Sequence, residues 1–170
     1  TAVRESVQRV TAALDNSHFY RPPELVVTVN LSPADVRKQG ASFDLPIALG
    51  LEISIQTTID KKPDAHCRRV PVGLEDWCIV GELSLDGSVR GVRGALAVAV
   101  AARAAGRKYL MLAEENAAEA AVVEGITVYG VRNLSHAWDV LLDRTRFTPA
   151  APLPPAEGAL GDIDFDEVKG

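Results

Sequence analysis

Seven basic residues are the first candidates for chemistry in this sequence, because guanidinium and ammonium groups bind phosphate. They stand in three short groups: Arg37 and Lys38, then Arg90 and Arg93, then Arg103, Arg107 and Lys108. Clustered cations of this kind contact the phosphates of nucleic acids. An ordinary solvated surface is the simpler interpretation, because the first 150 residues hold 18 acidic and 17 basic side chains. Both interpretations stay open at this point.

Sequence motifs for nucleotide and metal binding are missing from these 170 residues. No G-x-x-x-x-G-K-[ST] phosphate loop occurs, so no nucleotide-binding loop is predicted within the chain. There is no H-E-x-x-H and no C-x-x-C pair, and His66-Cys67 stands far in sequence from the other histidines. We therefore expect neither a metal nor a cofactor to bind to this part of the protein.

The composition is that of an ordinary soluble domain, with 47% apolar and 24% charged residues. No apolar run reaches the roughly 18 residues that span a bilayer, and no signal peptide is visible. Two cysteines in 170 residues exclude a disulfide scaffold. These features predict a cytoplasmic protein without a membrane partner.

The elements that must position these residues follow from apolar spacing and turn residues. Helices are predicted over residues 2–14, about 44–56, 94–105, 116–124, and from Asn133 or Ser135 to about residue 144. Strands are predicted over residues 25–31, 78–85, 88–92, 109–113 and 126–131, with a hairpin turn at Asp86-Gly87. Asp44 is the expected N-cap of its helix, and residues 57–73 resemble a surface insertion. The sum is an α+β domain, a hairpin-containing sheet with helices packed on it.

The end of the chain differs in composition from the rest. Four prolines lie between positions 149 and 155, and residues 151–170 carry five acidic side chains and one lysine. This pattern is typical of a linker, so the domain is expected over residues 1–147 and the linker over residues 148–170. Ile163, Phe165 and Val168 restore apolar spacing, as if a further unit began there.

Two long segments resemble a known family. They are NLSPADVRKQGASFDLPIAL at positions 30–49 and GELSLDGSVRGVRGALAVAVAARAAG at positions 81–106. Together, and in this order, they are similar to the N-terminal domain of magnesium-chelatase-like AAA+ ATPases, the ComM/YifB group. The resemblance implies the fold of the Lon protease catalytic domain, a ribosomal protein S5 domain 2-like fold with a mixed sheet. The insertion at 57–73 departs from the family, which also has strands before position 1, so a trimmed N-terminus is expected.

The likeness to Lon proteases also implies a test of peptidase activity. In those enzymes the nucleophilic serine follows a K-x-G-x segment, and here residues 38–41 precede Ser42 in that pattern. The lysine that serves as the base would fall at position 96, which holds Leu96. A leucine cannot accept a proton, and a nucleophile without its base loses several powers of ten in rate. A non-catalytic domain is therefore expected, and a degenerate Ser-Lys peptidase is the weaker alternative.

The resemblance further implies a larger parent protein. Residues 164–170 (DFDEVKG) are similar to the junction at which the AAA+ ATPase module of the family begins. The parent would be a hexameric ATPase that uses ATP and magnesium and acts on branched DNA in recombination and competence. Its implied partners are its own AAA+ module, neighbouring subunits and DNA. The alternative role is a DNA-contacting module that uses the arginine groups. Nothing in these residues supports chelation of magnesium into a porphyrin.

Overall fold

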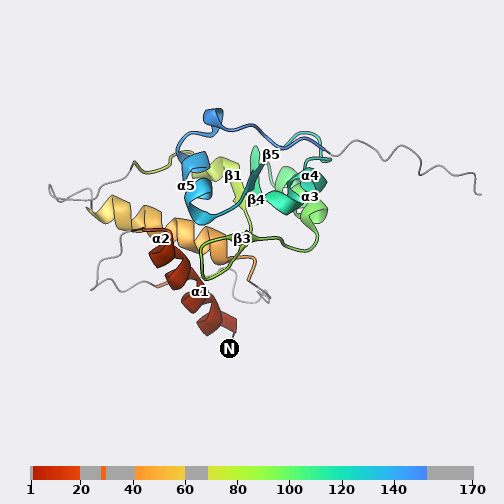
Figure 1. The fold of residues 1–170 in the computed structure, drawn as a ribbon. Helices are drawn as coiled ribbons and strands as arrows, with labels where there is room; N and C mark the ends of the chain where they lie inside the picture. Colours follow the sequence, from red (N-terminus) through yellow and green to blue (C-terminus); the bar gives the residue numbers. More distant parts are fainter. Residues whose placement is uncertain (1, 20–27, 30–40, 60–68, 153–170) are drawn as a thin grey trace, which may run out of the picture.

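The computed structural model describes residues 2–19, 28–29, 41–59 and 69–152 (Figure 1). Its helices are α1 (Ala2–Asn16), α2 (Asp44–Ile59), α3 (Ala95–Ala104), α4 (Glu114–Ala120) and α5 (Leu134–Leu142), with short 3-10 turns η1 (Leu74–Asp76) and η2 (Arg144–Arg146). Its strands are β1 (Trp77–Ile79), β2 (Glu82–Leu83), β3 (Val89–Arg90), β4 (Tyr109–Ala113) and β5 (Thr127–Val131). None of the helices in these ranges is long and apolar enough to cross a bilayer.

A parallel sheet with the strand order β1-β4-β5 forms the centre of the domain. Trp77 lies opposite Tyr109, and Leu110 lies opposite Val128. The β2–β3 hairpin is a separate antiparallel pair, in which Leu83 lies opposite Val89. A bridge between Ser88 and Asn133 ties this hairpin to the start of α5.

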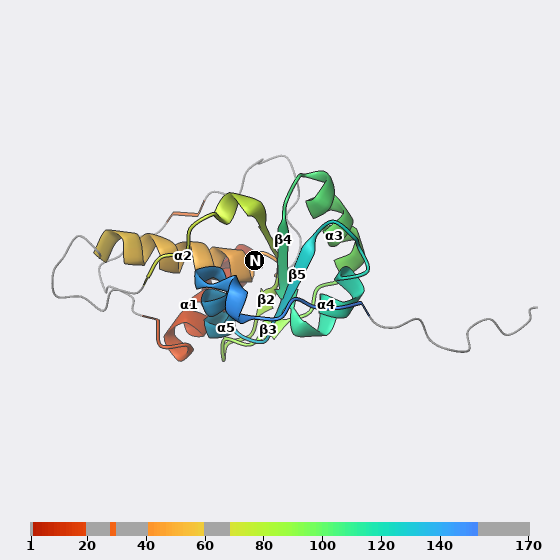
Figure 2. The ribbon, with the colours of Figure 1, turned by 90° about the horizontal axis from the view of Figure 1, so that it is seen from above.

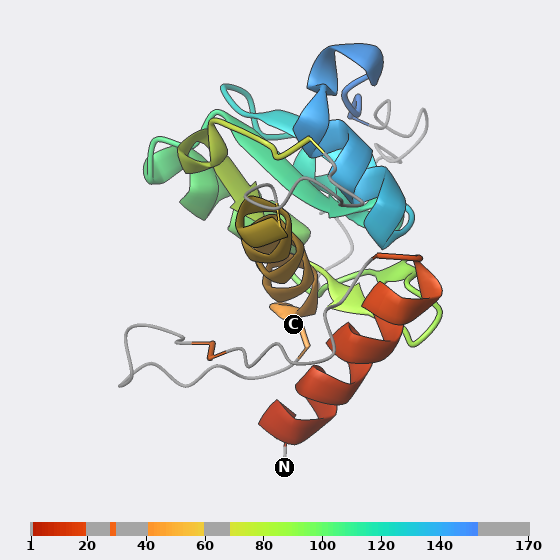
Figure 3. The ribbon, with the colours of Figure 1, turned by 90° about the vertical axis from the view of Figure 1, so that its left-hand side faces the viewer.

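The parallel sheet is covered on both faces because its strands alternate between two apolar cores. Trp77, Met111 and Tyr129 belong to the core under α1, α2 and α5. Leu110 and Val128, one position away along β4 and β5, belong to the core under α3 and α4. The two sets of helices accordingly lie on opposite sides of the sheet (Figures 2 and 3).

The structure confirms most of the predicted elements. The helices expected over 2–14, 44–56 and 94–105 correspond to α1, α2 and α3, and the strand over 109–113 is β4. Gly106 follows α3 with a left-handed backbone (φ 73°), as a C-terminal glycine should. Of the two candidates for the α5 cap, the structure selects Asn133, whose side chain accepts the backbone N–H of His136. The structure also agrees with the predicted α+β class, because it contains helices and a parallel sheet.

The prediction of one strand over 78–85 in a hairpin-containing sheet is wrong. The chain leaves the parallel sheet after Ile79 and enters the separate hairpin at Glu82. The physical reason is Gly81, whose N–H donates to the Ser42 carbonyl at 2.9 Å and whose carbonyl accepts the Leu45 N–H at 3.0 Å. These bonds to the start of α2 replace the bonds of a continuous strand.

Three further boundaries differ from the prediction. The helix expected over 116–124 is α4, which begins at Glu114 and ends at Ala120, where Val123 N–H bonds back to the Ala120 carbonyl at 3.2 Å. Residues 57–59 of the expected insertion at 57–73 belong to α2, which ends at Ile59, and residues 60–68 lie outside the described residues. Of the strand expected over 25–31, only residues 28–29 are described, outside any strand, and the rest lies outside the described residues.

Candidate functional site

Ser42 lies in a turn immediately before α2, held at the end of the parallel sheet where β1 finishes. Its carbonyl accepts the N–H of Gly81, two residues after β1 ends. The approach is close, because a Cβ on Gly81 would lie 2.9 Å from Val89 Cγ1 and 3.0 Å from Leu45 Cδ2. Glycine at position 81 therefore lets the hairpin pack against the start of α2 and fixes the backbone of Ser42.

The side chain of Asp44, next to this turn, does not cap α2. The first bond of the helix runs from Ile47 N–H to the Phe43 carbonyl, so Phe43 occupies the cap position and the predicted N-cap at Asp44 is wrong. The Asp44 carboxylate is fully buried and binds across the fold instead. It accepts the Ser6 hydroxyl, Arg9 Nε at 2.6 Å and the Leu83 N–H at 3.5 Å. The hydrogen bond from Arg9 to Asp44 and the negative charge of Asp44 raise the pKa of Arg9 above its ordinary value. The partial burial of Arg9 opposes this shift.

Leu96, at the position where the resemblance would place a catalytic lysine, lies in the first turn of α3. Its side chain is 44% exposed, and its backbone N–H donates to Glu119 Oε1 at 3.1 Å. Within the described ranges Lys108 is the single lysine. It precedes β4 and pairs with Asp76, which precedes β1, whereas Ser42 is held beyond the other end of β1. The described residues therefore bring no lysine to Ser42.

The candidate phosphate-binding residues lie at both ends of α3. Arg90 and Arg93 precede the helix, while Arg103, Arg107 and Lys108 lie at its end, and all five are exposed. Ten helical residues separate the two groups by about 15 Å. Arg37 and Lys38, the remaining candidates, lie outside the described residues. The structure therefore does not bring the five described cations into one patch.

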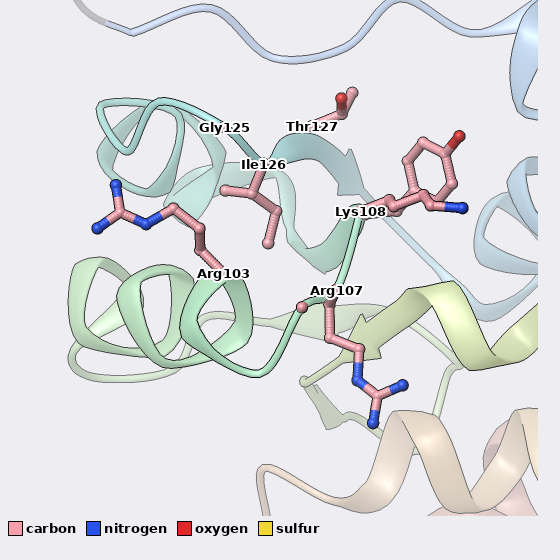
Figure 4. Close-up of a pocket in the computed structure, with 8 residues that line it drawn as sticks. Arg103, Arg107, Lys108, Gly125, Ile126 and Thr127 are labelled. Carbon is pink, nitrogen blue, oxygen red and sulfur yellow. The ribbon is translucent and has the colours of Figure 1, made fainter.

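An open depression of about 560 Å³ lies at the C-terminal end of α3, lined by Arg103, Arg107 and Lys108 together with Gly125 and Thr127 (Figure 4). Arg103 Nη1 donates to the Glu124 carbonyl at 3.3 Å, and Arg107 Nη1 donates to the Glu75 carbonyl. Lys108 Nζ lies 3.1 Å from Asp76 Oδ2. Figure 4 shows these three side chains pointing in different directions. The geometry offers separate cationic contacts rather than one converging anion site.

Metal chemistry has no support in the part of the chain that the structure describes, where no group of three or more His, Cys, Asp or Glu side chains could hold an ion. Cys78 is half-buried on β1, and burial raises the pKa of its thiol. His66 and Cys67 lie outside the described residues.

Comparison with known proteins decides the family. Residues 1–116 match the family described as subunit ChlI of Mg-chelatase. The chain belongs to this family. The matched segment contains Ser42, Leu96 and the described cations, and it ends within α4.

The curated relatives place this ChlI-family chain in the ComM/YifB group, as its motifs indicate. It is 39% identical over 126 residues to the uncharacterized protein YifB of Escherichia coli, covering 74% of this chain and 22% of YifB. It is 38% identical over 132 residues to the competence protein ComM of Haemophilus influenzae, covering 78% of this chain and 23% of ComM. An uncharacterized protein of Mycobacterium tuberculosis is 36% identical over 166 residues, which are 95% of this chain and 31% of that protein. The ChlI-family chain thus spans less than a third of the length of these relatives.

The structure of this ChlI-family domain also shows polar residues that the sequence did not single out. Glu115 Oε1 and Asn116 Oδ1, both on α4, accept the backbone N–H groups of Gly91 and Val92. Glu119 on α4 likewise accepts the backbone N–H of Leu96, so three α4 side chains accept backbone N–H groups at the start of α3. The N-cap residue Gly94 has no side chain that could accept such a bond. A glycine at the start of this helix was the sequence feature that indicated a missing side-chain cap. Only the fold shows which α4 side chains accept the N–H groups instead.

Proposed function

We propose that this chain is the non-catalytic N-terminal domain of a magnesium-chelatase-like AAA+ ATPase that remodels branched DNA during recombination and competence. The observation that carries the proposal is the match of residues 1–116 to the ChlI family. The relative named competence protein ComM supports the biological setting.

The non-catalytic role rests on the residues around the serine. Leu96 replaces the expected base, and Lys108, the lysine within the described ranges, lies beyond the opposite end of the sheet. A Ser-Lys mechanism needs the amine within hydrogen-bond reach of the hydroxyl. The degenerate-peptidase alternative is therefore the weaker proposal.

The proposal also covers the specific fold of this domain and the ligands of the longer protein to which it belongs. A ribosomal S5 domain 2-like, Lon-like fold is supported by the motif order and by a helix-covered sheet with an adjoining hairpin. ATP and magnesium would bind to the AAA+ module after this domain, and that module and neighbouring subunits of a hexamer would be the partners.

The test uses the full-length protein. We expect magnesium-dependent ATP hydrolysis that increases when a four-way DNA junction is added, together with ATP-dependent movement of the branch point in a gel assay. Replacement of the phosphate-loop lysine should abolish both activities and leave the protein folded. A full-length protein that hydrolyses no ATP, or that ignores branched DNA, would refute the motor proposal.

Direct DNA contact is a second candidate, because four exposed arginines at the ends of α3 form no ion pair with a described carboxylate: Arg90, Arg93, Arg103 and Arg107. Arg103 and Arg107 bond to backbone carbonyls, and Arg93 has no ion pair with a described residue. Replacing Arg93, Arg103 and Arg107 by Gln in the full-length protein should weaken junction binding and reduce its salt dependence by about one counterion per lost phosphate contact. Arg146→Gln, an exposed arginine outside these groups, is the matched control. An unchanged salt slope would leave this domain as an assembly element.

A further inference from the structure

Helix α3 presents an apolar outer surface to solvent. Leu96 and Val100, one turn apart, are each 44% exposed. Ala97, Ala101 and Ala104 are exposed beside them. These five side chains lie at positions i, i+1, i+4, i+5 and i+8, so they form one continuous stripe along the helix. We call this stripe the outer face of α3.

The opposite side of α3 is apolar as well. Ala95, Ala99 and Ala102 are buried against the sheet and α4. Arg103 is the one charged residue within the helix. A helix that is apolar all round is typical of one buried on both sides. An ordinary surface helix would carry polar residues where α3 carries Leu96 and Val100.

The chain leaves the described part of the domain on the same side of the sheet as α3. The N–H of Ala150 donates to the Val128 carbonyl at 2.8 Å, next to β5. Ala150 packs against the core that contains Ala95 and Ala99. Figures 1 and 2 both show the last described residues passing toward the α3–α4 side, whereas α1 and α2 lie on the other side. The described chain therefore ends on the side of the sheet that carries α3.

The size of the outer face favours a tethered partner. The face is about 15 Å long, whereas an interface between separate proteins of standard size buries about 800 Å² on each partner. One short face of Leu, Val and Ala side chains supplies only part of that area. A module joined to the same chain needs less contact area, because the linker keeps its local concentration high.

We propose that the outer face of α3 packs against the ATPase module that follows residue 170 in the full-length protein. This inference rests on the proposed function, because it requires such a module. This docking requires an apolar contacting surface on the module, with carboxylates at its border to pair with Arg93 and Arg103, the exposed cations at the two ends of the stripe. The helix that carries Leu96 in place of a catalytic base thereby serves as a docking element.

The test is photo-crosslinking in the full-length protein. Val100 is replaced by p-benzoyl-L-phenylalanine, and the crosslinked peptides are identified by mass spectrometry. We expect a product with the mass of a single chain, in which position 100 is joined to a peptide of the ATPase module. The matched control carries the same residue at Leu85, which is 58% exposed in the hairpin turn and belongs to neither α3 nor α4. Crosslinking to the module should be at least fivefold weaker from position 85.

Each other outcome overturns the inference. Crosslinks between chains would assign the face to a second copy, and crosslinks to residues that precede position 1 would assign it to the N-terminal part of the parent. A module crosslink no stronger from position 100 than from position 85 would show that the face is not docked. ATP hydrolysis measured on the same preparation separates the two proposals. An active ATPase without the crosslink refutes the docking alone, whereas an inactive protein refutes the motor proposal.

Discussion

Arg9 on α1 donates from Nε to the fully buried carboxylate of Asp44, the first residue of α2, over 2.6 Å. Its Nη2 reaches the second carboxylate oxygen at 3.4 Å. The same carboxylate accepts the N–H of Leu83 on β2. The ion pair and the Leu83 bond thus join α1, α2 and the hairpin, and Asp44 lies two residues after Ser42.

Removal of the cation should destabilise this junction. Arg9→Met leaves the fully buried Asp44 carboxylate without its cationic partner, and we expect a loss of about 3 kcal/mol in the free energy of unfolding. The double variant Arg9→Met/Asp44→Leu should recover part of this loss, because no buried charge remains. Urea denaturation followed by circular dichroism measures both. Arg93→Met, at an exposed arginine, should change stability by less than about 0.5 kcal/mol. An equal effect of the two single variants would contradict the importance of the ion pair.

The cap of α5 gives a test at single-residue resolution. Asn133 Oδ1 accepts the N–H of His136 at 2.8 Å, so Asn133→Ala should cost about 1 kcal/mol. In a domain of this size the melting temperature should fall by about 2–4 °C. Ser135→Ala, at the other candidate cap, should leave the melting temperature nearly unchanged. If the two variants have the same melting temperature, the cap assignment is wrong.

His136 should make the stability of the domain depend on pH. Burial and the charge of Arg132 lower the pKa of His136 below its ordinary value, while Glu114 and Asp139 oppose this shift. The unfolded chain therefore binds a proton at a higher pH than the folded chain does. The contribution of His136 to the free energy of unfolding is complete at pH values above its ordinary pKa, which is near 6.5. It is lost as the pH falls through the lowered pKa of the folded state. Between pH 7 and pH 5, unfolding free energies of the native protein should fall more steeply than those of His136→Gln. Parallel curves would contradict the assignment.

Ser42 should not react as an activated serine. A fluorophosphonate probe, which labels activated serines, should not modify Ser42, because the described residues bring no lysine to it to serve as the base. A serine peptidase labelled under the same conditions is the positive control. Labelling that disappears in Ser42→Ala would restore the peptidase alternative.

Much of the fold could be predicted because the signals were local. The apolar spacing of α1 and the alanine-rich run of α3 indicated helices, and residues 109–113 were predicted as the strand that is β4. The strand predicted over 78–85 failed because its interruption depends on bonds between Gly81 and α2, which are distant in sequence. The cap expected at Asp44 failed for the same reason, because Arg9, 35 residues away, binds its carboxylate.

For the candidate site, too, some features depend on the sequence alone and others on the tertiary structure. The sequence by itself determined the family and the absence of a lysine at position 96, because both depend only on residue identity and order. Only the tertiary structure decided that Lys108 lies beyond the opposite end of the sheet from Ser42, and that the cations divide between the two ends of α3. It also decided that Leu96 and Val100 face solvent while Ala95 and Ala99 face the core. The physical reason is that side-chain exposure and long-range distance depend on how distant segments pack, which no local pattern records.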